Sequence, residues 1–69
     1  MKRNHVDSSN IESIGYDYSS QTLEIEFLNG TIYQYFDVPQ HIYDGIMSAD
    51  SAGKYLADNI KGHYRYSKI

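Results

Sequence analysis

Residues 23–27 alternate strictly between apolar side chains and glutamates, and this is the clearest hydrophobic pattern in the chain. A period of two is expected of a strand with one buried side. Asn29 and Gly30 follow directly, and both residues tolerate the positive φ angles of a hairpin turn. The pattern therefore predicts a hairpin whose next strand runs from Thr31 to about Asp37.

A further strand is predicted before this hairpin, and a helix after it. Ile11, Ile14 and residues 16–18 indicate a first strand, which ends at a polar run of Ser and Gln residues. Pro39 suits the first turn of a helix, where its missing N–H group costs nothing. Gly45 weakens this helix. Its apolar side is expected to contain Ile42, Tyr43, Ile46 and Met47.

A second helix is predicted after the first, because Asp50 or Ser51 can cap its start and Gly62 can end it. Residues 63–69 are expected to be extended. The chain is thus predicted to be one α+β domain over residues 1–69. A three-stranded antiparallel meander is followed by two short helices packed on one face, and an extended C-terminal segment completes it. The inward side chains of the second helix are expected to be Ala52, Tyr55, Leu56 and Ile60.

The composition shows what must stabilise this fold. A chain of 69 residues has one thin core, since so short a chain buries only about 60% of the surface it exposes when unfolded. It contains no cysteine, so disulfides and zinc thiolates do not contribute. Its eight Tyr and two Phe are therefore needed for packing, because each ring can bury about 150–250 Å².

The charges are distributed unevenly along the chain. The net charge of −3 argues weakly against nucleic acid. However, the segment 6–50 contains eight acidic residues and no Lys or Arg. Residues 1–5 contain two basic residues, and residues 51–69 contain four basic residues and one acidic residue. Any basic surface must come from the two ends. No apolar signal segment or membrane span is present, so a cytoplasmic protein without a membrane partner is expected.

The motifs of this chain, taken in order, resemble those of the KTSC domain. They are Ile14-Gly15-Tyr16-Asp17, residues 23–27 leading through Gly30 to Tyr33-Gln34-Tyr35, Val38-Pro39 with Tyr43, residues 49–53, and Ile60 with Tyr64 and Tyr66. The family is named for its place at the C-terminus of some lysyl-tRNA synthetases, and it also occurs as a stand-alone bacterial protein. The resemblance implies an accessory domain, not an enzyme, that is suspected of binding RNA.

Tyr33 and Tyr35 point to the same face of their strand, and the hairpin turn decides which face that is. A two-residue turn pairs Glu26 with Tyr33 and turns both rings outward, where they could stack on unpaired bases. A turn of residues 28–30 with Gly30 as a left-handed bulge pairs Ile25 with Tyr33 and places the rings in the core. We favour the core register, because a domain this small needs the rings.

The C-terminal segment is the best sequence candidate for nucleic-acid binding. Its rings and basic groups alternate, which is the mixture used on single strands. The alternative is that the two tyrosines seal the core while the basic residues are ordinary solvated charges. The candidate residues are Lys61, Tyr64, Arg65, Tyr66 and Lys68, together with Lys54 at the start of the second helix. Lys54 would assist a phosphate at the helix N-terminus, although a plain helix cap is the more common use of such residues.

Catalysis, metals and cofactors find no support in the sequence. The three histidines are far apart, and His41 and Asp44 supply only two of the ligands that a metal site needs. Two functions therefore stay open. The first is an accessory domain that binds RNA weakly and with little sequence preference. The second is a protein-interaction module or homodimer that uses the open sheet face or an edge strand.

Overall fold

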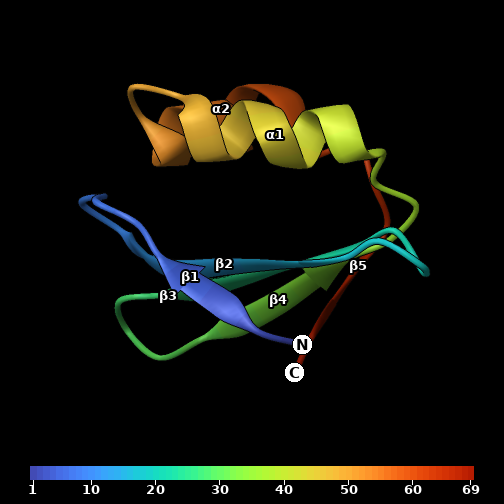
Figure 1. Cartoon of the computed structure of the whole chain (residues 1–69). Helices are drawn as coiled ribbons and strands as arrows, with labels where there is room; N and C mark the ends of the chain where they lie inside the picture. Colours follow the sequence, from blue (N-terminus) through green and yellow to red (C-terminus); the bar gives the residue numbers. More distant parts are fainter.

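The computed structural model describes residues 1–69, and its centre is one antiparallel sheet of five strands. The strands lie side by side in chain order, and both helices pack against the same face of the sheet (Figure 1). The elements are β1 (Arg3–His5), β2 (Ile11–Asp17), β3 (Thr22–Phe27), β4 (Ile32–Tyr35), α1 (Gln40–Ser48), α2 (Ala52–Asn59) and β5 (Tyr66–Lys68).

The predicted α+β class is confirmed, but the predicted number of strands is wrong. Two more strands, β1 and β5, form the two edges of the sheet, and each has only three residues. Most of their side chains are exposed, so neither segment shows an alternation of apolar and polar residues. A short edge strand pairs through its backbone on one side only, which leaves little trace in the sequence. β5 does lie within the segment that was predicted to be extended.

The turn between β3 and β4 has the bulged register. The Phe27 N–H donates to the Thr31 carbonyl at 2.8 Å, and the Gly30 N–H donates to the Phe27 carbonyl at 2.9 Å. Gly30 has φ of 90°, a conformation that glycine adopts without strain. As a result Ile25 pairs with Tyr33. The core register favoured from the sequence is confirmed, and both tyrosines of β4 lie on the helix-covered face.

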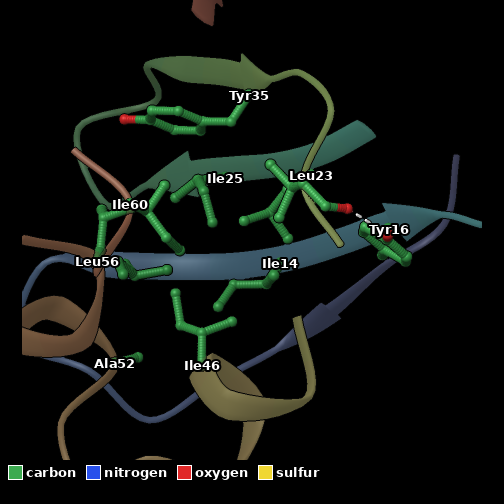
Figure 2. Packing of buried hydrophobic residues seen from close by; sticks show 11 residues of the cluster. Ile14, Tyr16, Leu23, Ile25, Tyr35, Ile46, Ala52, Leu56 and Ile60 are labelled. Atoms are coloured by element: carbon green, nitrogen blue, oxygen red, sulfur yellow. Dashed lines mark hydrogen bonds between the residues drawn. The ribbon is translucent and has the colours of Figure 1, made fainter. Parts of the chain in front are cut away.

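The hydrophobic core fills the space between the sheet and the two helices (Figure 2). It is built almost entirely from residues that the apolar patterns of the sequence place inward. The buried residues from the strands are Ile11, Ile14, Tyr16, Leu23, Ile25 and Tyr35, and those from the helices and loops are Val38, Ile46, Ala52, Leu56 and Ile60. The predicted inward residues Ile42, Tyr43, Met47 and Tyr55 are partly buried against this cluster.

The two helices begin close to where the sequence places them. Pro39 is the N-cap of α1, so the helix starts one residue later than predicted. Ser51 caps α2 by accepting a hydrogen bond from the Lys54 N–H at 3.2 Å. Gly45, which weakens α1 as a helix former, has a packing role: a Cβ atom there would lie 2.0 Å from the Tyr55 hydroxyl oxygen. A larger residue at this position would therefore force the Tyr55 ring to move.

Candidate nucleic-acid interface

Three tyrosines form a compact triangle on the helix-covered side of the sheet, near its β5 edge. Tyr66 lies opposite Tyr35 in the β4–β5 pairing. The rings of Tyr33 and Tyr66 are nearly parallel, at 19°, with centroids 5.7 Å apart, and Tyr35 lies 5.8 Å from Tyr66 and 6.4 Å from Tyr33. Only 3% of Tyr35 is exposed, compared with 62% of Tyr66. The three rings thus reach from the core to the surface.

A groove lies over these three rings, and we call it the tyrosine groove. Its larger part has a volume of about 430 Å³ and lies between β4, β5 and the end of α2. A smaller hollow of about 230 Å³ shares Tyr33, Tyr35 and Lys61 with it and extends towards the β3–β4 turn. Across both parts the lining residues are Phe27, Asn29, Thr31, Tyr33, Tyr35, Lys61, Gly62, Tyr66 and Lys68. No carboxylate lines either part.

Two lysines supply the positive charge of the groove. Lys61 follows α2, where the chain turns back towards the sheet at Gly62, which has φ of 81°. Lys68 lies opposite Tyr33 in the β4–β5 pairing, so its side chain leaves the sheet on the same side as the tyrosine rings. Neither lysine takes part in a salt bridge. Both ammonium groups are therefore available to an anion.

Tyr35 packs against the other two rings from the side of the core. Figure 2 shows its ring beside Ile25 and Ile60, at the end of the core. Burial, and to a smaller extent the neighbouring Tyr33 and Tyr66, raises the pKa of its hydroxyl. This ring is a packing residue, so the stacking surface of the groove comes from Tyr33, which is half-buried, and Tyr66.

Two of the basic candidates from the sequence lie elsewhere and have partners. Arg65 points away from the groove, where its guanidinium contacts the Asp37 carboxylate at 2.7 Å and lies over the Phe36 ring. Lys54 contacts Asp58 at 2.7 Å on the surface of α2, and this hydrogen bond raises the pKa of its ammonium group. The structure thus separates Lys61 and Lys68 from these two residues.

The remaining predicted residue, Tyr64, is half-buried against the core. It lines a neighbouring hollow with Phe36 and Arg65, which shares Gly62 and Tyr66 with the tyrosine groove. The other end of the groove, which Phe27 and Asn29 line beside the β3–β4 turn, is not among the residues predicted from the sequence. The alternation in β3 is the signal that could have found it, because Phe27 shares the face of the two tyrosines of β4.

The basic N-terminus does not add to the groove. β1 forms the edge of the sheet opposite to β5. Its Arg3 lies on the face away from the helices and forms an ion pair with Glu24 and a longer one of 3.5 Å with Glu26. Burial alone would raise the pKa of Glu24, but the hydrogen bonds from Gln34 and Arg3 outweigh it and hold this pKa below its ordinary value. The open face is therefore a polar layer with its charges paired.

A second group of aromatic rings, here called the acidic tyrosine cluster, lies at the C-terminal end of β2. Tyr16 stacks on Tyr43 with centroids 4.9 Å apart, and Tyr18 meets Tyr16 edge to face at 5.0 Å. The Tyr16 hydroxyl donates a hydrogen bond to the Val38 carbonyl, which is the dashed line in Figure 2. Burial first, and then the nearby Tyr18, Asp44 and Asp17, raise the pKa of Tyr16.

No group of three or more His, Asp or Glu side chains lies close enough together to hold a metal ion. None of the helices is long and apolar enough to cross a bilayer. The fold and the groove thus define a small α+β domain with an aromatic, lysine-lined groove at one edge of its sheet.

Comparison with known proteins identifies the family. A profile of the KTSC domain matches residues 7–64. The crystal structure of a KTSC domain protein from Yersinia pestis superposes with a TM-score of 0.93 at 43% identity, covering 99% of this chain and 96% of that one. This chain therefore belongs to the KTSC domain family.

Two relatives show the two settings of such a sequence. An uncharacterized protein from Stutzerimonas stutzeri is 41% identical over 70 residues, covering 100% of this chain and 99% of its own length. A lysine–tRNA ligase from Nostoc sp. is 36% identical over 63 residues, which cover 91% of this chain but only 11% of the ligase. Related sequences thus occur both as almost the whole of a small protein and as a small part of a large one.

Proposed function

We propose that this KTSC domain is a non-catalytic accessory domain that binds RNA through the tyrosine groove. The observation that carries the proposal is the combination of exposed rings and unpaired lysines in one carboxylate-free groove. Tyr33 and Tyr66 supply the rings, and Lys61 and Lys68 supply the charge.

Each component suits a part of a single-stranded nucleic acid. A base that stacks on an aromatic side chain contributes about 1–3 kcal/mol, and it does so with little preference for sequence. A lysine beside the stacked base attracts the phosphate and releases its counterions. The net charge of −3 opposes the approach of RNA at long range, so the groove is expected to bind weakly and best at low salt.

The lysine–tRNA ligase relative suggests how weak binding becomes useful. In that protein the related segment is 11% of the length, so it is tethered to a much larger polypeptide. A tethered second site raises the overall affinity through effective concentration, even when the site alone is weak. A domain that acts alone needs another tether or a high concentration of its ligand.

Titration with total cellular RNA at several salt concentrations tests the proposal. Two phosphate contacts to a single strand give a slope of log affinity against log salt of about −1.4. The double variant Lys61→Gln with Lys68→Gln should flatten the slope to near zero. Lys54→Gln is the matched control, because it removes one ammonium group that lies away from the groove and is paired with Asp58. Absence of binding at about 50 mM salt, or equal slopes for all variants, rules the proposal out.

A second candidate function is protein binding by strand addition at the free edge of β5. The Phe36 N–H donates to the Arg65 carbonyl and the Ile69 N–H to the Ile32 carbonyl. Since backbone groups alternate in direction along an antiparallel strand, those of Tyr66 and Lys68 point outwards. These free groups can pair with an extended segment of a partner. The mass of the protein in solution and its elution with candidate peptides test this alternative.

A further inference from the structure

The shape of the tyrosine groove limits the ligand more narrowly than RNA in general. We infer that the groove takes a run of one or two unpaired nucleotides, such as a single-stranded end, and neither a duplex nor a long single-stranded tract. This inference rests on the proposed function, because it names the RNA element that the groove would bind.

The spacing of the rings decides how a base can stack. The centroids of Tyr33 and Tyr66 are 5.7 Å apart, and those of Tyr33 and Tyr35 are 6.4 Å apart. A base inserted between two rings needs about twice the stacking distance of about 3.4 Å, which is more than either spacing allows. Bases must therefore stack on the outer surfaces of the rings.

The number of available rings sets the number of bases. Tyr35 is buried and offers no free ring face, which leaves exposed Tyr66 and half-buried Tyr33. Tyr33 also contacts Tyr35, Tyr66 and, edge to face at 5.9 Å, Phe27, so only part of its ring is accessible. One exposed ring and one partly accessible ring accommodate one or two bases. The bases must also be unpaired, because inside a duplex both ring faces of a paired base are covered by its neighbours in the stack.

The size and charge of the groove agree with this limit. The two parts have volumes of about 430 and 230 Å³ and share three residues. Together they fall in the range of about 300–1,000 Å³ that is usual for sites of small-molecule size. Lys61 and Lys68 supply two charges, which match the two phosphates of a 5′-phosphorylated dinucleotide. Beyond Tyr66 lies the hollow lined by His63 and Arg65, and the Arg65 guanidinium is already paired with Asp37. A longer strand thus meets no further unpaired Lys or Arg there.

A length series of RNA oligonucleotides tests the inference. Isotope-labelled protein is titrated with a mononucleotide, a dinucleotide and a hexanucleotide, and with a blunt RNA duplex with or without a two-nucleotide overhang. The dinucleotide should bind about tenfold more tightly than the mononucleotide, as expected for one more stacked base. The hexanucleotide should gain no more than about fivefold over the dinucleotide, because it offers five positions for the same two-base contact. The overhang should restore the affinity that the blunt duplex lacks.

Variants of the exposed ring complete the test. Tyr66→Ala should lower the dinucleotide affinity about tenfold, to the level of the mononucleotide, whereas Tyr66→Phe should retain most of it. A gain of more than about a hundredfold from dinucleotide to hexanucleotide would overturn the length limit while the proposed function stood. Tight binding of the blunt duplex would have the same meaning. If no oligonucleotide binds and total RNA does not bind either, the proposed function itself fails.

Discussion

The two groups of tyrosines in this domain are built alike but lie in opposite electrostatic surroundings. Each lies on the helix-covered side, and each joins a buried ring to an exposed one. In the acidic tyrosine cluster these two rings belong to one Tyr-x-Tyr sequence, whereas in the tyrosine groove they come from two such sequences, at residues 33–35 and 64–66. Tyr16 is 9% exposed beside Tyr18 at 60%, and Tyr35 is 3% exposed beside Tyr66 at 62%. The acidic tyrosine cluster is flanked by Asp17 and Asp44, whose charges act on Tyr16. The tyrosine groove is lined instead by two lysines and by no carboxylate.

This difference shows that the Tyr-x-Tyr spacing alone does not determine which ring is exposed, and that the charges of the neighbouring residues separate the two groups. In β4 the strand period of two puts Tyr33 and Tyr35 on one face, but the exposed ring of the groove comes from the paired strand β5. Carboxylates beside the exposed ring repel phosphate, whereas lysines attract it. A Tyr-x-Tyr sequence alone therefore does not indicate nucleic-acid binding.

The largest expected effect separates the buried ring of the groove from its exposed ring. Tyr35→Ala should lower the free energy of unfolding by about 3 kcal/mol or more, because it leaves a cavity in the thin core. Tyr66→Ala should lower it by less than about 1 kcal/mol, since the side chain is mostly exposed. Urea denaturation followed by circular dichroism measures both values. Equal losses for the two variants would mean that Tyr66 also belongs to the core.

The same conservative substitution should act differently on the two buried tyrosines. Tyr16→Phe removes the hydrogen bond to the buried Val38 carbonyl and should lower the free energy of unfolding by about 1–2 kcal/mol. The Tyr35 hydroxyl makes no hydrogen bond to another part of the protein. Because every fully buried polar side-chain atom has a hydrogen-bond partner, this hydroxyl is not fully buried and reaches the groove. Tyr35→Phe should therefore change stability by less than about 0.5 kcal/mol. The comparison needs only thermal or urea melts of three proteins.

Alkaline pH gives a smaller effect that involves both groups. Burial raises the pKa of Tyr16 and of Tyr35 above 10.0 in the folded protein, so each favours the protonated form when folded. Their contribution to stability is complete below pH 10.0, the value for the unfolded chain, and is lost as the pH rises through the folded-state pKa values. Stability should thus fall from about pH 10 upwards. Tyr35→Phe should reduce this dependence, and a stability independent of pH in this range would contradict the raised pKa values of the two tyrosines.

The sequence predicts the centre of this fold better than its edges. The alternation of residues 23–27 and the left-handed Gly30 correctly predict the hairpin register, because both are local signals. β1 and β5 cannot be predicted in this way, because each has only three residues, most of them exposed, and carries no pattern. β1 is held by its backbone pairing with β2 and by the contact of Arg3 with Glu24, which lies far away in the sequence.

For the same reason the candidate site could be predicted only in part. The sequence singles out a C-terminal segment that mixes rings and charges, but it does not distinguish Arg65 from Lys68. The partner of Arg65 is Asp37, which lies 28 residues away and is brought near by the pairing of β4 with β5. The register that turns Lys68 towards Tyr33 is a tertiary feature of the same kind. Only the assembled sheet shows which charges are paired and which are free.

If neighbouring charges decide which of the two tyrosine groups binds RNA, only the tyrosine groove should respond to an RNA ligand. Isotope-labelled protein is titrated with an RNA dinucleotide at low salt while the resonances of both groups are followed. We expect shifts at Tyr33, Tyr66 and Lys68, with Tyr18 and Tyr43 unchanged. Shifts centred on Tyr18 and Tyr43, or equal shifts at both groups, would show that the neighbouring charges do not select the ligand.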